Sequence, residues 1–105
     1  MIHKIVSLYD AKAQVFSQPH FVQSTGAAIR SLQQLINSPE KKSDVAQFPG
    51  DFTLFELGEW NDATAEWTIH KGPMELAKCL SLVDDPREQP LPLEAVSDNE
   101  AADAA

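Results

Sequence analysis

The chain has 105 residues, 43% of them hydrophobic, and a formal net charge of −8. This length suffices for one domain and excludes two, because neither half would bury enough core. No apolar run approaches the roughly 18 residues of a membrane helix, and the N-terminus lacks a signal-peptide apolar segment. We therefore expect a soluble intracellular protein.

The negative charge is concentrated near the C-terminus. Residues 84–105 contain seven acids and one arginine, a net −6, whereas residues 1–83 contain nine acids and seven bases, a net −2. Residues 84–105 also contain three prolines and few large apolar side chains, too few to offset the roughly 1–2 kcal/mol per residue that backbone ordering costs. We predict a folded domain over residues 1–83 and a disordered acidic tail over residues 84–105.

The first half of the domain predicts strands followed by a helix. Apolar residues indicate a buried strand over His3–Tyr9, and Val15–Phe16 and Phe21–Gln23 are short extended segments. Pro19 cannot donate to a strand ladder, which places these short segments at a sheet edge or bulge.

The clearest helix follows at residues 26–37. Ser24 or Thr25 is suited to cap it, and Asn37-Ser38-Pro39 ends it, because helical backbone is disfavoured for the residue before a proline. Its apolar stripe consists of Ala28, Ile29, Leu32, Leu35 and Ile36.

The segment from Phe48 to His70 predicts a β-hairpin. Its turn is Asn61–Thr64, because Asn and Asp favour turn conformations, and Glu66–His70 forms the returning strand. Strict alternation along residues 52–60 places Phe52, Leu54 and Trp60 on one side, with Glu56 and Gly58 between them, and Thr53, Phe55, Leu57 and Glu59 on the other.

The remaining segments complete an α+β fold. Glu40–Gln47 is polar and predicts a surface loop, whereas Pro73 is suited to begin a second helix that continues to Val83. An extended edge strand over Ala77–Val83 is the alternative. We predict a small antiparallel sheet of about four strands, including the hairpin of residues 52–60 and 66–70, packed against two helices.

No motif for catalysis, a metal or a cofactor occurs in the sequence. The three histidines are scattered, and Cys79 is the single cysteine, which we expect to be a buried hydrophobic residue. Glu56 and Glu59 are three apart on a strand and are expected to point to opposite faces. We expect a protein that is not an enzyme and that needs no cofactor.

Nucleic-acid binding is the class that the residues leave open. If DNA is contacted directly, the candidates are Lys4, Lys12, Arg30 and Lys71 for phosphates, and Trp60 and Trp67 for base stacking. The alternative for the two tryptophans is a cross-strand packing pair.

Three segments together resemble one viral family. LYDAKAQVFSQPHF (residues 8–21), STGAAIRSLQQLIN (residues 24–37) and FPGDFTLFELGEWNDATAEW (residues 48–67) resemble, in order and spacing, the small nonstructural protein of gokushoviruses. These are single-stranded DNA bacteriophages of the Microviridae. The resemblance covers about residues 1–83 and does not include residues 84–105.

The resemblance implies a function but no site residues. The family is equated with the microvirus protein C, which implies a role in viral DNA replication, at the switch to single-strand synthesis, and in DNA packaging. The implied partners are viral single-stranded DNA, or the replication-initiation protein and the procapsid, in the host cytoplasm and without a membrane. The alternative is a protein–protein adaptor, as a monomer or a homodimer, that engages phage or host proteins without touching DNA.

Overall fold

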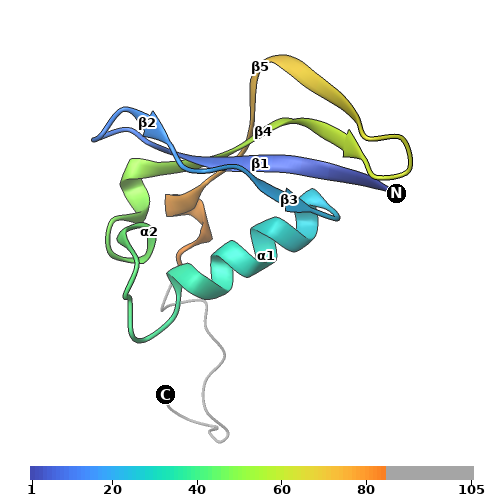
Figure 1. Cartoon of the computed structure of the whole chain (residues 1–105). Helices are drawn as coiled ribbons and strands as arrows, with labels where there is room; N and C mark the ends of the chain where they lie inside the picture. Colours follow the sequence, from blue (N-terminus) through green and yellow to red (C-terminus); the bar gives the residue numbers. More distant parts are fainter. Residues whose placement is uncertain (85–105) are drawn as a thin grey trace, which may run out of the picture.

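The computed structural model describes residues 1–84 and has a curved antiparallel sheet with helices on one face (Figure 1). This arrangement confirms the predicted α+β class. The strands are β1 (Ile2–Asp10), β2 (Val15–Phe16), β3 (His20–Val22), β4 (Phe52–Asn61) and β5 (Glu66–Lys78). The helices are α1 (Thr25–Ile36) and α2 (Asp44–Gln47), with 3₁₀ turns η1 (Pro49–Asp51) and η2 (Cys79–Leu82). The predicted tail lies, except for Asp84, outside the described residues.

Strand β1 organises the sheet. One of its edges pairs with β4 along its whole length, and the other pairs with β2 at one end and β3 at the other. The strand predicted for residues 3–9 is therefore confirmed, extended by one residue at each end. Pro19 falls between β2 and β3, where the edge ladder is interrupted, as its missing N–H predicts.

Helix α1 is confirmed with its cap. The Ser24 hydroxyl accepts a hydrogen bond from the backbone N–H of Ala27 at 3.1 Å, which satisfies one of the free donors of the first turn. The helix ends at Ile36, and Asn37 closes it. Leu32 and Ile36 are its buried residues and face the sheet.

The core lies between the sheet and the helices. Its buried members are Val6, Leu32, Ile36, Val45, Leu54 and Cys79. Cys79 is fully buried, as predicted, and burial raises the pKa of its thiol to about 11. Among residues 1–84 no helix lies on the other face of the sheet.

The helix predicted from Pro73 to Val83 is wrong. Strand β5 continues to Lys78, and η2 follows it. Leu76 packs against the core from this strand, so the apolar residues of the segment are used in extended form. Apolar runs of this length fit a short buried helix and a strand equally well, and pairing with β4 decides between them.

The second helix is instead α2, within the segment predicted as a loop. The Ser43 hydroxyl accepts from the backbone N–H of Ala46 at 3.3 Å and caps this single turn. Val45 and Ala46 are buried by it. Two apolar residues among polar ones were too weak a pattern to predict this helix.

An extra residue in β4 changes which side chains share a face. Ile5 pairs with Gly58 and Val6 pairs with Glu56, so Leu57 has no partner on β1 and forms a β-bulge. Beyond the bulge the alternation is reversed. The predicted sides of β4 are therefore correct from Phe52 to Glu56 and wrong for the residues that follow Leu57.

Candidate functional surface

The outer face of the sheet, meaning the face opposite α1, carries a cluster of aromatic rings. Trp60 and Trp67 are cross-strand partners with ring centroids 6.2 Å apart. The Phe21 ring, from β3, lies 5.4 Å from Trp60 and 5.7 Å from Trp67, and His3 lies 5.5 Å from Trp60. We call His3, Phe21, Trp60 and Trp67 the tryptophan cluster. The bulge at Leu57 creates it, because it turns Trp60 to the outer face.

The rings of the tryptophan cluster pack against one another and are also exposed to solvent. Trp67 is 59% exposed and Phe21 is 50% exposed, while Trp60 is partly covered between them. Ile5 lies beneath the cluster on the same face and is buried. The predicted cross-strand packing of the two tryptophans is confirmed, yet their rings remain open to solvent.

A second group of rings continues the outer face toward its other end. Tyr9 lies 4.8 Å from Phe16 and 6.4 Å from Phe55, and Phe16 lies 5.6 Å from Phe55, all as centroid distances. Polar residues usually occupy the solvated face of an antiparallel sheet. Aromatic residues in that position make this face a candidate interaction surface.

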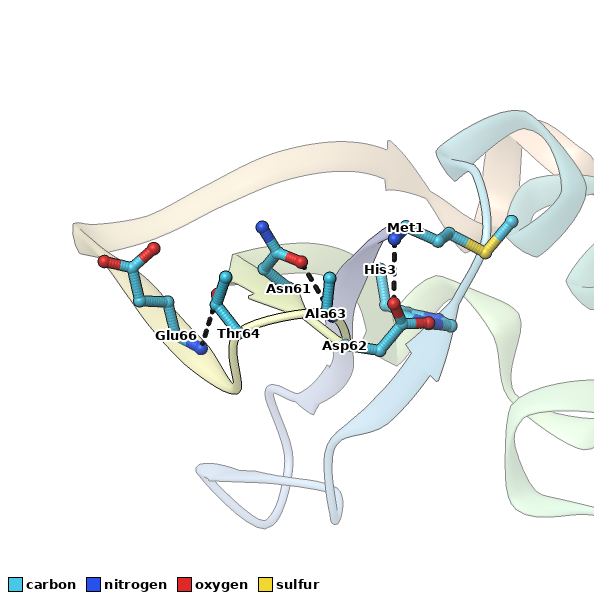
Figure 2. A network of polar contacts seen from close by, with 7 residues as sticks. All are labelled: Met1, His3, Asn61, Asp62, Ala63, Thr64 and Glu66. Carbon is cyan, nitrogen blue, oxygen red and sulfur yellow. Dashed lines mark hydrogen bonds and ion pairs between the residues drawn. The ribbon is translucent and has the colours of Figure 1, made fainter.

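The tip of the β4–β5 hairpin holds the end of this surface in place (Figure 2). Asp62 accepts from the N-terminal ammonium of Met1 and contacts His3 Nε2, both at 2.8 Å. The Met1 ammonium and then His3 lower the pKa of Asp62. In the turn, Asn61 Oδ1 accepts from the backbone N–H of Ala63 at 2.9 Å, which confirms the predicted turn. Asp62 thereby holds the N-terminus and His3, whose ring lies against that of Trp60.

The candidate phosphate-binding residues are not brought together. Lys4 is on the helix side of the sheet, and its ammonium donates to Glu59. Lys12 lies in the turn between β1 and β2, Arg30 lies on the exposed side of α1, and Lys71 lies in the middle of β5. Of the six residues predicted to touch DNA, the structure assembles only Trp60 and Trp67.

A charged group that sequence reasoning missed lies on the helix side. Lys4 and Val6 share a face of β1, so their partners Glu59 and Glu56 also share a face, and the expectation that they oppose each other is wrong. The hydrogen bond from Lys4 lowers the pKa of Glu59, and the same bond raises that of Lys4. Without the bulge these carboxylates would have pointed apart.

Glu56 is the buried member of this group. It is 3% exposed, and its Oε2 lies 2.6 Å from His70 Nε2. A buried carboxylate needs such a partner, because leaving it unpaired in a region of low polarity costs several kcal/mol. The pair links β4 to β5 where the latter leaves the regular ladder. Its contacts are those of a structural hydrogen-bonded pair.

An apolar groove of about 470 Å³ opens between α1 and the β1–β3 edge. Val22, Ala28 and Leu35 contribute to its walls. It offers apolar contact without a charged group.

Among residues 1–84 there is no group of three or more His, Cys, Asp or Glu placed to hold a metal. Within the same residues no helix is long and apolar enough to cross a membrane.

Comparison with known proteins identifies one family. The family model described as phage ORF5 protein matches residues 3–82, which includes both helices and, except for Ile2, all of the described strands. No curated protein and no solved structure matches the chain.

Proposed function

The chain belongs to the phage ORF5 protein family, and from this premise we propose that it binds single-stranded viral DNA through its outer face. In this proposal it is a non-enzymatic, nonstructural protein of a gokushovirus, similar to protein C. It acts in the host cytoplasm, in single-strand synthesis and DNA packaging. The resemblance of residues 8–21, 24–37 and 48–67 supports the role, and the aromatic surface supports the mode of binding.

The observation that carries this proposal is the exposure of the tryptophan cluster. Proteins that bind single strands without sequence preference stack bases on aromatic side chains displayed by a sheet. Trp67 and Phe21 lie on the same face but come from strands at opposite edges of the sheet. Both expose half or more of their surface. A single strand crossing β3, β1, β4 and β5 would therefore meet consecutive rings.

Stacking supplies most of the affinity in this arrangement. Each stacked base contributes about 1–3 kcal/mol, as judged by alanine substitution. Lys4 is paired with Glu59, and the remaining candidate bases are spread over different elements. Few phosphates are then neutralised, so binding has a shallow salt dependence, with a slope of about −0.7 per phosphate contact.

The test compares two variants of the full chain. Trp67→Ala removes an exposed ring of the cluster, and we expect it to weaken binding of an oligothymidylate about 5- to 150-fold, the equivalent of one lost stacking contact. Phe48→Ala is the matched control, because Phe48 is 57% exposed and lies outside the two aromatic groups. It should bind as the unmodified chain does.

Measurement at two salt concentrations separates the possible outcomes. Equal binding by Trp67→Ala and Phe48→Ala would show that the cluster does not contact DNA. No binding by the unmodified chain at low salt would remove direct DNA contact altogether. A steep loss of affinity with salt would mean that phosphate contacts, and not stacking, carry the interaction.

A protein–protein adaptor is the second candidate, and the dispersal of the basic residues favours it. An apolar surface without clustered lysine or arginine also suits the core of a protein interface, where aromatic residues are enriched and charges are depleted. The partner would be the replication-initiation protein or the procapsid. Loss of capture of either one by Trp67→Ala, in a chain that binds no oligonucleotide, would favour this function.

A further inference from the structure

Strand β5 leaves one edge of the sheet open. It is the last strand in the order β2-β1-β4-β5, and no other strand among residues 1–84 pairs with its far edge. Its residues from Glu66 to Ile69 pair regularly with β4 and are all exposed. Figure 1 shows β5 arching away from β4 further along, which matches the jump in register between Ile69 and Met74.

The regular part of this edge has neither a proline nor a bulge to block pairing, and Glu66 is its one charged residue. Open edges are commonly protected by proline, by a bulge or by an inward-pointing charge. In β5 those features begin after His70, with the arch and Pro73. The segment Glu66–Ile69 is flat enough to keep its ladder with β4 and contains neither proline nor lysine. Its free backbone groups are therefore available to another strand.

We propose that two copies of this chain pair antiparallel through the Glu66–His70 edge, with the two-fold axis at Thr68. Residues that face each other across such a pair point to the same side of the sheet, so their numbers must differ by an even number. Centring on Thr68 places Thr68 opposite its copy, Trp67 opposite Ile69 of the second copy, and Glu66 opposite His70 of the second copy.

This register suits the side chains. Threonine pairs and aromatic–aliphatic pairs are each favourable across antiparallel strands, whereas His70 keeps its contact with Glu56. Trp67 and Ile69 both lie on the outer face, and Ile69 is 62% exposed in the single chain. Because of the two-fold axis, the contact between Trp67 of one copy and Ile69 of the other occurs twice in the interface. This self-complementarity favours a second copy over an unrelated strand.

The pairing doubles the surface described above. A two-fold axis perpendicular to the sheet keeps both outer faces on the same side, so the two tryptophan clusters become neighbours on one continuous sheet. The functional value of this arrangement rests on the proposed DNA binding, but the pairing itself does not. Five residues from each chain form a small interface, so weak association, detectable by about 1 mM, is expected.

Cross-linking of the full chain tests the register. Residues facing each other across antiparallel strands have Cα atoms about 4.5–5.5 Å apart, within the range that a disulfide spans. With dissolved oxygen as the oxidant, Thr68→Cys should therefore form a disulfide-linked dimer at least about tenfold faster than Ala63→Cys, because pairing raises the effective thiol concentration. Ala63 is an exposed turn residue, and the unmodified chain, whose Cys79 is buried, is the second control.

The outcomes separate this proposal from DNA binding. Equal rates for Thr68→Cys and Ala63→Cys, with unchanged circular dichroism, would overturn the register. Sedimentation of the unmodified chain as a monomer up to about 1 mM would overturn the pairing itself. Rapid cross-linking by a chain that binds no oligonucleotide would leave the dimer standing and remove only the DNA-binding function.

Discussion

Gly58 is the residue where a single methyl group tests the arrangement of β4 and β5 most sharply. A Cβ at this position would lie 2.3 Å from the backbone oxygen of Thr68 and 2.9 Å from Cα of Ile69. Both are backbone atoms of the paired strand, so no side-chain rotation relieves the contact. Gly58→Ala therefore forces the two strands apart next to the bulge.

The size of the effect follows from this contact. Overpacking a well-packed site costs about 1–3 kcal/mol, and an overlap with rigid backbone belongs at the upper end of that range. Alanine would recover about 0.5–1 kcal/mol through its smaller loss of backbone entropy. We expect a net loss of about 2 kcal/mol, which lowers the melting temperature of a domain of this size by roughly 8–16 °C.

Thermal unfolding followed by circular dichroism measures this loss. Gly26→Ala is the matched control, because Gly26 is in α1 and has no atom within 4 Å of its would-be Cβ. It should raise stability by about 0.5–1 kcal/mol, since alanine is the better helix former. A melting temperature for Gly58→Ala equal to or above that of the unmodified chain would refute the close approach of the two strands.

Three further predictions concern the charged groups. His70→Ala leaves the buried Glu56 unpaired and should cost about 2 kcal/mol in urea unfolding, and an unchanged midpoint would argue against the pair. Lys4 lowers the pKa of Glu59 in the folded state. The stability that this pair contributes is therefore present above pH 4.5, the ordinary pKa of a glutamate, and is lost as the pH falls through the lower pKa of the folded state. The stability difference between the unmodified chain and Lys4→Met should therefore shrink during acid titration, and a constant difference would contradict the pair. A chain ending at Asp84 loses six acids and one arginine, and it should bind oligonucleotide more tightly than the full chain at low salt.

Local signals were sufficient for the first half of the domain. The apolar run of β1, the Ser24 cap and the stripe of α1 each act within a few residues, so the sequence alone predicts both elements. The hairpin turn at Asn61–Thr64 is equally local, because its side chains bond their own backbone.

The features that were not predictable depend on long-range pairing. Extended backbone from Pro73 to Lys78 is selected by the ladder with β4, which no pattern within the segment reveals. The bulge at Leu57 likewise depends on how β1 and β4 align. That one residue moved Trp60 to the outer face and Glu59 to the helix side, so alternation alone misplaced both.

The candidate surface was predicted in part. Trp60 and Trp67 were correctly paired, because tryptophans flanking a hairpin turn suit cross-strand contact. The contribution of Phe21 was not foreseen, because β3 reaches the cluster only by pairing with β1. Binding of phosphates by the basic residues requires that they cluster in space, which the sequence alone does not show.

Tryptophan fluorescence of the full chain, with acrylamide as a neutral quencher, tests the central claim most directly. Both tryptophans belong to the displayed cluster, so acrylamide should quench the free chain efficiently. Saturating single-stranded oligonucleotide should lower the emission through base stacking and then protect the remaining emission from acrylamide. Unchanged emission and unchanged quenching on adding oligonucleotide would contradict the claim that this face binds DNA.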